Sequence, residues 1–167
     1  MSVSRLIARP LLAAGFIYGA QSALRNAEAF ATKASPVADA VVPKVRNAGV
    51  PLSNNPETLV KINAAVQIAG GLALATGKAP RLGALALSAS MVPTTVAGHP
   101  FWSESDPAVK KTMQMHFFKN LSMLGGAIIA AGDTDGKPGV AWRARRAAKD
   151  ARRETKHVTK LAGAKLG

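Results

Sequence analysis

Residues 67–93 read QIAGGLALATGKAPRLGALALSASMVP, two apolar runs separated by a tight turn that carries Lys78 and Arg81. Neither run has a polar stripe at helical spacing, so a helix built from either one is apolar on every side. A surface helix of a small water-soluble domain needs a solvated face, whereas a helix in a lipid bilayer does not. The stretch therefore predicts two membrane-crossing helices joined by a short turn.

Two further apolar runs, residues 10–24 and 120–131, bring the number of such segments to four. Each run is shorter than the roughly 20 residues that a helix needs to cross a bilayer, so each must extend into its flanks. We expect the spans near the following residues: 6–24, 58–76, 81–98 and 114–131.

The extended spans include Arg9, Lys61 and Lys119. Long basic side chains near the end of a span can extend their charged groups to the membrane–water interface. The competing interpretation is a soluble all-α domain with buried core helices, which the length of the runs alone does not exclude. The missing polar stripes favour the membrane.

The formal net charge of +13 is distributed unevenly along the chain. Residues 137–167 contain ten of the 22 Lys and Arg, opposed only by Asp150 and Glu154. With four spans, this tail, the N-terminus and the 77–81 turn lie on one side of the membrane, and basic short loops stay in the cytoplasm. We therefore predict an all-α, four-helix transmembrane bundle with both termini cytoplasmic.

The predicted organisation is a membrane domain over residues 1–136 and a basic, helical cytoplasmic tail over residues 137–167. The outer side then receives a loop of about thirty residues after the first span, whose prolines suggest short surface helices. An open alternative concerns the first span, because its basic start, apolar centre and Ala-x-Ala positions at Ala27 and Ala29 also describe a cleaved signal peptide.

Several classes of chemistry are excluded by the residues that the chain lacks. There is no cysteine, so disulfides, thiolate metal sites and iron–sulfur clusters on the chain are impossible. No acidic residue lies inside a predicted span, which argues against a proton pump or an ion-coupled carrier.

Two segments should meet at the outer ends of the third and fourth spans: TTVAGHPFW at 94–102 and MQMHFFKN at 113–120. They would gather two imidazoles, aromatic rings and a Lys-Asn pair. One interpretation is a site for a quinone headgroup, whose carbonyl oxygens accept hydrogen bonds beside aromatic walls. A second is an interfacial cap that satisfies loose backbone ends, and a metal site has too few ligands. The candidate binding residues are His99, Phe101, Trp102, His116, Lys119 and Asn120.

The glycine pairs Gly70-Gly71 and Gly125-Gly126 lie within the second and fourth spans, where small residues let helix backbones approach closely. They fit packing inside one bundle or an interface with a partner. Pro93 should kink the third span near its outer end and free a carbonyl for a nearby threonine.

The tail AWRARRAAKDARRETKHVTKLAGAKL, residues 141–166, is rich in good helix formers and in arginine. Basic residues on the cytoplasmic side are attracted to anionic lipids, although a solvated tail fits the sequence equally well. Trp142 is its only aromatic residue, so we expect no nucleic-acid partner. The candidate lipid-facing residues are Arg143, Arg145, Arg146, Arg152 and Arg153.

Two blocks stand out in the sequence: AGHPFW within residues 70–102 and FFKNLSMLGG within residues 106–148. Over about residues 56–142, the chain resembles the DoxX family of small bacterial membrane proteins. The resemblance is to the actinobacterial branch of this family in particular. The resemblance implies a four-helix bundle with both ends inside, which favours a retained first span. Where many relatives have an acidic residue, this chain has Gln67, so carboxylate chemistry is not expected. The motif positions carried over are Gly98, His99, Phe101, Trp102, Lys119, Asn120, Gly125 and Gly126.

The family takes its name from a subunit type of thiosulfate:quinone oxidoreductase, and some members associate with respiratory or oxidative-stress complexes. The resemblance thus implies a non-catalytic accessory or stabilising partner of membrane redox machinery, in a membrane protein complex and in contact with anionic lipids. The main alternative is a quinone-reactive oxidoreductase subunit, with quinone as its ligand. A third is a secreted basic nucleic-acid-binding protein, which requires cleavage near Ala29 or Ala31.

Overall fold

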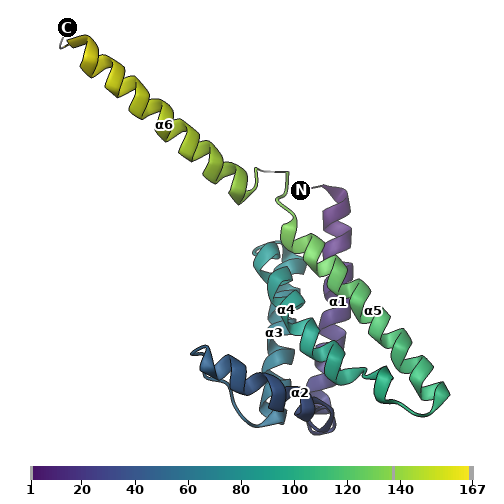
Figure 1. The fold of residues 1–167 in the computed structure, drawn as a ribbon. Coiled ribbons are helices and arrows are strands. Elements are labelled where there is room, and N and C mark those ends of the chain that lie inside the picture. The colour runs from purple at the N-terminus through teal and green to yellow at the C-terminus, as the bar shows by residue number, and fades with distance from the viewer. Residues whose placement is uncertain (1, 137, 166–167) are drawn as a thin grey trace. The chain divides into compact units, whose positions relative to one another are not determined.

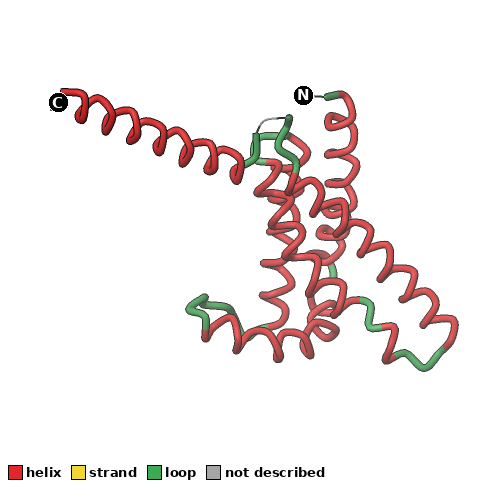
Figure 2. Tube along the Cα trace, turned by 45° about the horizontal axis from the view of Figure 1, so that its top comes forward, coloured by secondary structure: helices red, strands yellow, loops and turns green. Residues whose placement is uncertain are grey.

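The computed structural model describes residues 2–136 and 138–165, and over these residues every regular element is helical (Figures 1 and 2). The all-α prediction is therefore confirmed. The chain divides into two compact units, Met1–Gly132 and Asp133–Gly167. The elements are α1 (Val3–Arg25), α2 (Ala27–Asn47), α3 (Pro56–Thr76), α4 (Pro80–Gly98), a 3-10 turn η1 (Phe101–Ser103), α5 (Pro107–Gly132) and α6 (Val140–Lys165).

The four predicted spans correspond to α1, α3, α4 and α5, which contain 23, 21, 19 and 26 residues. At 1.5 Å per residue these helices are about 28 to 39 Å long, close to or above the roughly 30 Å of a hydrocarbon core. Among the described residues, α3 alone is both long enough and apolar enough to be recognised as a membrane-crossing helix by composition. Arginine, hydroxyl-bearing and other polar residues lower the mean hydropathy of the other three helices.

The start and end of α3 follow from local backbone chemistry. The Asn55 side-chain oxygen accepts hydrogen bonds from the backbone N–H groups of Glu57, at 2.8 Å, and Thr58, at 3.4 Å. This is the usual N-cap arrangement, with Pro56 in the first turn, where its missing N–H costs nothing. The helix ends at Gly77, whose φ of 68° is the left-handed conformation that glycine adopts readily. The short turn that follows makes α3 and α4 antiparallel neighbours.

The closest helix contact in the bundle joins α3 to α4 at two glycines. A Cβ atom added to Gly83 would lie 2.5 Å from the Gly70 carbonyl oxygen, and one added to Gly70 would lie 3.0 Å from the Gly83 oxygen. The two backbones therefore touch, as the small-residue pattern predicts. Leu74 and Leu87 are fully buried beside this contact.

Helix α1 belongs to the core of this unit. Ala13, Phe16 and Ala20 recur at helical spacing along one face, and each is only 1% exposed. A Cβ atom added to Gly71 of α3 would lie 2.8 Å from the Ile17 side chain.

The burial of α1 corrects one sequence-based expectation. Arg9 is 5% exposed, because it lies on the same buried face as Ala13 and Phe16 and does not reach outward to an interface.

Residues 27–47 form one continuous helix, α2, where the sequence suggested a loop with short helices. It packs across the ends of α3 and α4 near the bottom of Figure 1. Pro36 and Pro43 are seven residues apart, so they lie on one face, and both are exposed. Both pyrrolidine rings therefore lie on the exposed side of α2, and the helix continues through both prolines.

Two residues expected in helix packing do not take part in it. A Cβ atom added to Gly98 or Gly125 would meet nothing within 4 Å, because both glycines face away from the neighbouring helices. Gly126 differs, since its added Cβ would lie 3.3 Å from Leu12 of α1. The helix continues through the exposed Pro93, and Thr94 donates its hydroxyl to the Ser90 carbonyl at 2.8 Å.

Helix α5 begins seven residues before the predicted span. The Asp106 carboxylate accepts hydrogen bonds from the N–H groups of Ala108, at 2.8 Å, and Val109, at 3.1 Å, and so caps the helix. At the other end, Arg81 Nε donates to the Ala131 carbonyl at 3.1 Å and fastens the last turn of α5 to the start of α4.

Candidate functional site

A compact turn brings the end of α4 beside the first half of α5. The His99 N–H group donates to the Thr95 carbonyl at 3.1 Å and closes the last turn of α4. The Phe101 N–H group then donates to the His99 carbonyl at 2.9 Å, and the Ser103 N–H group donates to the Pro100 carbonyl at 3.1 Å. These bonds reverse the chain direction, so that His99 and η1 face residues from α5.

The two imidazoles predicted at this end lie against one another. The rings of His99 and His116 are stacked, with centroids 5.3 Å apart and planes inclined by 23°. Lys119 Nζ lies 3.3 Å from His116 Nδ1. An ammonium group can only donate, so Nδ1 must accept, and neutral His116 therefore holds its proton on Nε2.

The surroundings of His99 disfavour its charged form. Partial burial lowers the pKa of His99, and the neighbouring His116, Lys119 and Lys33 lower it further. Lys33 belongs to α2, and His116 and Lys119 belong to α5, so the groups that lower the pKa of His99 come from two elements. His99 is thus a neutral hydrogen-bonding group in a positive field at neutral pH.

An aromatic cluster lies beside the imidazole pair, and Phe117 is its centre. The Phe117 ring meets Phe101 at 5.2 Å, Trp102 at 5.9 Å and Phe118 at 5.8 Å between centroids, all edge to face. Phe101 and Trp102 are themselves 5.2 Å apart. Edge-to-face packing is the preferred arrangement of aromatic rings, and here it fixes η1 to α5.

Lys119 and Asn120 point in different directions, so the two side chains do not act as the inward-facing pair that the sequence suggested. Asn120 is 8% exposed and lies on the face of α5 that also buries Ala127 and Ala131. Lys119 is exposed, because successive residues in a helix are rotated by about 100°. The lysine contributes to the imidazole pair from the surface, and the asparagine lies inside the bundle.

A second polar group connects α3 and α4 inside the bundle. Asn63 Nδ2 and Gln67 Nε2 both donate to the Thr94 hydroxyl oxygen, at 2.8 and 3.2 Å. Gln67 is 5% exposed. Each amide thereby has a partner in an apolar setting, which a buried polar group requires.

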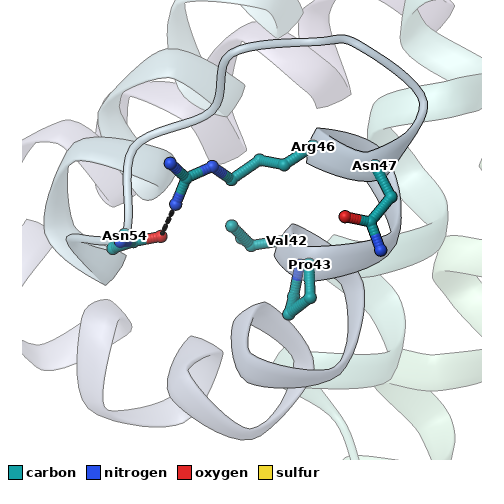
Figure 3. Close-up of a pocket in the computed structure, with 5 residues that line it drawn as sticks. All are labelled: Val42, Pro43, Arg46, Asn47 and Asn54. Carbon is teal, nitrogen blue, oxygen red and sulfur yellow. Dashed lines mark hydrogen bonds between the residues drawn. The ribbon is translucent and has the colours of Figure 1, made fainter.

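A hollow of about 460 Å³ lies elsewhere, over the second half of α2 (Figure 3). It is lined by Val42, Pro43, Arg46, Asn47 and Asn54. Arg46 already donates to the Asn54 side-chain oxygen at 2.9 Å, so its charge is partly engaged. No residue of the predicted cluster lines this hollow.

The predicted tail arginines lie on α6, which forms a unit of its own. All five, residues 143, 145, 146, 152 and 153, are exposed. Arg146 makes a 3.1 Å ion pair with Asp150 one turn away, and its guanidinium carbon lies 6.0 Å from the centre of the Trp142 ring. The other four remain available to an anionic surface.

For metal binding, the described residues contain no group of three or more His, Asp or Glu side chains in ligand geometry. The outer-end cluster provides its two imidazoles from different elements, at stacking distance.

Sequence reasoning overlooked two contributors to this site. Lys33 was missed because two prolines obscured α2, although apolar residues recur every three or four positions from Ala27 to Val45, which is a helical signal. Phe117 is not among the predicted binding residues, because nothing in its sequence context distinguishes it from Phe118.

Comparison with known proteins assigns the family. No curated protein and no solved structure matches the chain. The DoxX family model matches residues 4–100, more than half of the 167 residues, from α1 to the end of α4. The FFKNLSMLGG block lies beyond the matched range, whereas α1 lies within it. Membership of the actinobacterial branch stays a prediction. The chain belongs to the DoxX family.

Proposed function

We propose that the chain is a multi-pass membrane protein in which α1, α3, α4 and α5 cross the bilayer. The observation that carries this proposal is the number of large apolar side chains that these helices expose. A soluble monomer rarely exposes contiguous apolar surface on this scale, whereas lipid-facing helices require it. The exposed set is Val3, Leu6, Ile7, Leu11, Tyr18, Leu24, Ile62, Val66, Leu72, Leu82, Leu85, Val92, Val96, Val109, Met115, Phe118, Leu121, Ile128 and Ile129.

The polar residues of these helices support the same conclusion by facing the other way. Gln67, Ser90, Thr95 and Asn120 are buried, and Gln67 shares the Thr94 hydroxyl with Asn63. In hydrocarbon, polar side chains must face the bundle and hydrogen-bond there. The arrangement thus resembles a membrane bundle, with apolar groups outside and polar groups inside.

Two features support four spans with both termini in the cytoplasm. The core positions of α1, Ala13, Phe16 and Ala20, would be lost if the first helix were a cleaved signal peptide. Lys78, in the turn between α3 and α4, and Arg81, at the start of α4, would then face the cytoplasm, as would the basic α6, in agreement with the positive-inside rule. Helix α2 and the His99–His116 cluster would face outward.

Within the inner membrane, the chain acts as an accessory or stabilising partner of redox or respiratory machinery. This assignment rests on the associations of the DoxX family. It is supported by the polar and aromatic surface at the outer end, where Trp102 is 54% exposed beside the imidazoles. Interfaces favour aromatic residues flanked by polar groups, so the partner would dock at this end.

A second candidate is a quinone-reactive subunit. Edge-to-face aromatic rings beside two imidazoles and the Lys119 ammonium group provide both a wall for a quinone ring and donors for its carbonyl oxygens.

The topology can be tested directly, because the chain has no cysteine and each introduced cysteine is therefore a unique label. Single cysteines replace Ser2, Ser53, Lys78 and Ser105 in turn, and intact spheroplasts are treated with a membrane-impermeant maleimide. Labelling at Ser53→Cys and Ser105→Cys alone supports four spans. Labelling at Ser2→Cys or Lys78→Cys before lysis contradicts them.

The role is tested by purification from the native membrane in mild detergent. Stoichiometric oxidoreductase or respiratory subunits without quinone support the accessory role. Quinone bound to the isolated protein, and lost in His99→Ala, favours the second candidate. A protein that purifies alone and without quinone contradicts both.

A further inference from the structure

The outer-end cluster, which is His99, His116 and Lys119 with Lys33 nearby, combines two lysine charges with two imidazoles that can donate hydrogen bonds. Lys33, His99, His116 and Lys119 come from α2, the end of α4 and α5. Within the described residues none of them makes an ion pair with an acidic side chain. An exposed pair elsewhere shows the usual alternative, since Lys61 lies 2.6 Å from Glu57 one turn away.

The nearby cations disfavour a proton on His99, and an anion bound beside the imidazoles would offset that unfavourable field. Lys119 contacts His116 at 3.3 Å, and His116 stacks on His99 at 5.3 Å. The structure thus brings hydrogen-bond donors from α5 and from the end of α4 to one place on the surface.

We propose that His99, His116 and Lys119 form a binding site for a phosphate-type anion at the outer surface of the bundle, with Lys33 of α2 adding to the positive field around it. The proposal rests on the outward orientation of this end given under Proposed function. Lysine offers a compact positive charge to phosphate oxygens, and imidazole offers an N–H donor. His116 is oriented for this purpose, because Lys119 engages its Nδ1 and leaves the Nε2 proton to donate elsewhere.

Two sources can supply such an anion. Phe101, Trp102 and Phe117 adjoin the imidazoles, and aromatic belts of this kind lie at the level of lipid headgroups. The phosphate could therefore belong to an anionic phospholipid of the outer leaflet. Free phosphate, or a soluble phosphate ester, presents the same oxygens from the water side.

Binding is expected to depend on pH. An anion beside the stacked rings favours the protonated form of His99. In the free protein, burial and the nearby cations lower the pKa of His99. The charged groups that act on it are Lys33 from α2, with His116 and Lys119 from α5. Binding should consequently take up a proton, and affinity should rise as the pH falls through the titration of His99.

The experiment uses the full chain carrying His157→Gln, so that the labelled imidazole signals arise from His99 and His116 only. In one arm, protein in neutral detergent is titrated with inorganic phosphate against chloride of equal ionic strength. In the other, nanodiscs of phosphatidylcholine are compared with nanodiscs that also contain phosphatidylglycerol. We expect both imidazole signals to shift, in the first arm if free phosphate is bound and in the second if a lipid headgroup is.

Substitutions identify the donors. Lys119→Gln should weaken binding about tenfold, the usual effect of losing a charge-assisted hydrogen bond, and Lys33→Gln should weaken it less, because Lys33 acts through the electrostatic field. Lys110→Gln on the same α5 helix is the matched control, because Lys110 is exposed and does not act on His99. Equal weakening by Lys110→Gln would reveal nonspecific attraction and overturn the site.

The absence of any shift in both arms, in protein that reconstitutes into nanodiscs with the predicted topology, also overturns the anion site. That outcome leaves the membrane proposal intact, whereas failure to reconstitute contradicts the membrane proposal itself.

Discussion

The imidazole rings of His99 and His116 stack at 5.3 Å, although one follows the end of α4 and the other lies within α5. The contact depends on the reversal of the chain through η1 and on the aromatic cluster that fixes η1 to α5. Lys119 then orients His116 from one turn away. The site is therefore a product of the α4–α5 connection, and changes in that connection should alter it.

Acidification should destabilise the folded protein through His99. Its pKa is lowered by burial and nearby cations in the folded state, while the unfolded chain keeps the ordinary value of 6.5. The unfolded state therefore binds more protons below that pH, so the stabilising contribution is complete above 6.5 and is lost as the pH falls below it. Denaturation midpoints in mixed micelles, measured in phosphate-free buffer at about pH 7.5 and about pH 5.5, should show this loss.

His99→Gln isolates the effect, since glutamine keeps a polar side chain but does not titrate in this range. The variant should lose less stability than the unsubstituted chain between the two pH values. An unchanged pH dependence in His99→Gln would assign the effect to other groups.

Gly83→Ala should destabilise the bundle where Gly125→Ala does not. An alanine Cβ at position 83 would lie 2.5 Å from the Gly70 carbonyl oxygen, so α3 and α4 must separate, at a cost of about 1–3 kcal/mol. A Cβ at position 125 meets nothing within 4 Å, and alanine has the higher helix propensity by about 1 kcal/mol. Unfolding free energies of both variants in detergent test the contrast, and equal effects would place the close approach elsewhere.

The helices were predictable because the signal that produces them is local. Apolar runs at 10–24, 62–76, 82–98 and 120–131 predict α1, α3, α4 and α5, and the turn at Gly77 predicts the α3–α4 pair. Helix α2 was not predictable by the same reading, because Pro36 and Pro43 usually end helices. In the structure α2 continues through both prolines and packs against α3 and α4, and these tertiary contacts are not visible in the local sequence.

The sequence predicts which residues belong to the candidate site better than it predicts how they are arranged. Aromatic residues and histidines at two span ends indicate one interface, and the two imidazoles do meet there. Packing determines which side of α5 faces α4. The sequence alone therefore does not predict that Lys119 is exposed and that its neighbour Asn120 is buried. The effect of Lys33 on His99 could not be predicted, because it depends on the position of α2 in the fold.

Phe117→Ala should loosen η1 from α5. The ring is half-buried and contacts Phe101, Trp102 and Phe118, so its loss should cost about 1–2 kcal/mol. With Trp142→Phe, Trp102 is the sole indole, and its emission should shift to longer wavelength as water reaches it. Phe118→Ala is the control, since that ring is 53% exposed and contacts Phe117 alone among the aromatic pairs of the described residues. An equal shift in both variants would contradict a central role for Phe117.

Thr94→Val should destabilise the contact between α3 and α4 without changing side-chain size. The Thr94 hydroxyl accepts from Asn63 at 2.8 Å and from Gln67 at 3.2 Å, so valine leaves two amide groups in an apolar setting without this partner. Hydrogen bonds between membrane helices are each worth about 0.6–1.7 kcal/mol, so we expect a loss of about 1–3 kcal/mol.

Ser88→Ala is the matched control for Thr94→Val, because the Ser88 hydroxyl donates only to the Ala84 carbonyl of its own helix, at 2.8 Å. It should change the unfolding free energy by less than Thr94→Val does. A double-mutant cycle with Asn63→Ala then tests the pairing itself. Coupling between Asn63 and Thr94 shows that the shared hydroxyl joins α3 to α4, whereas additive effects would mean that each residue acts within its own helix.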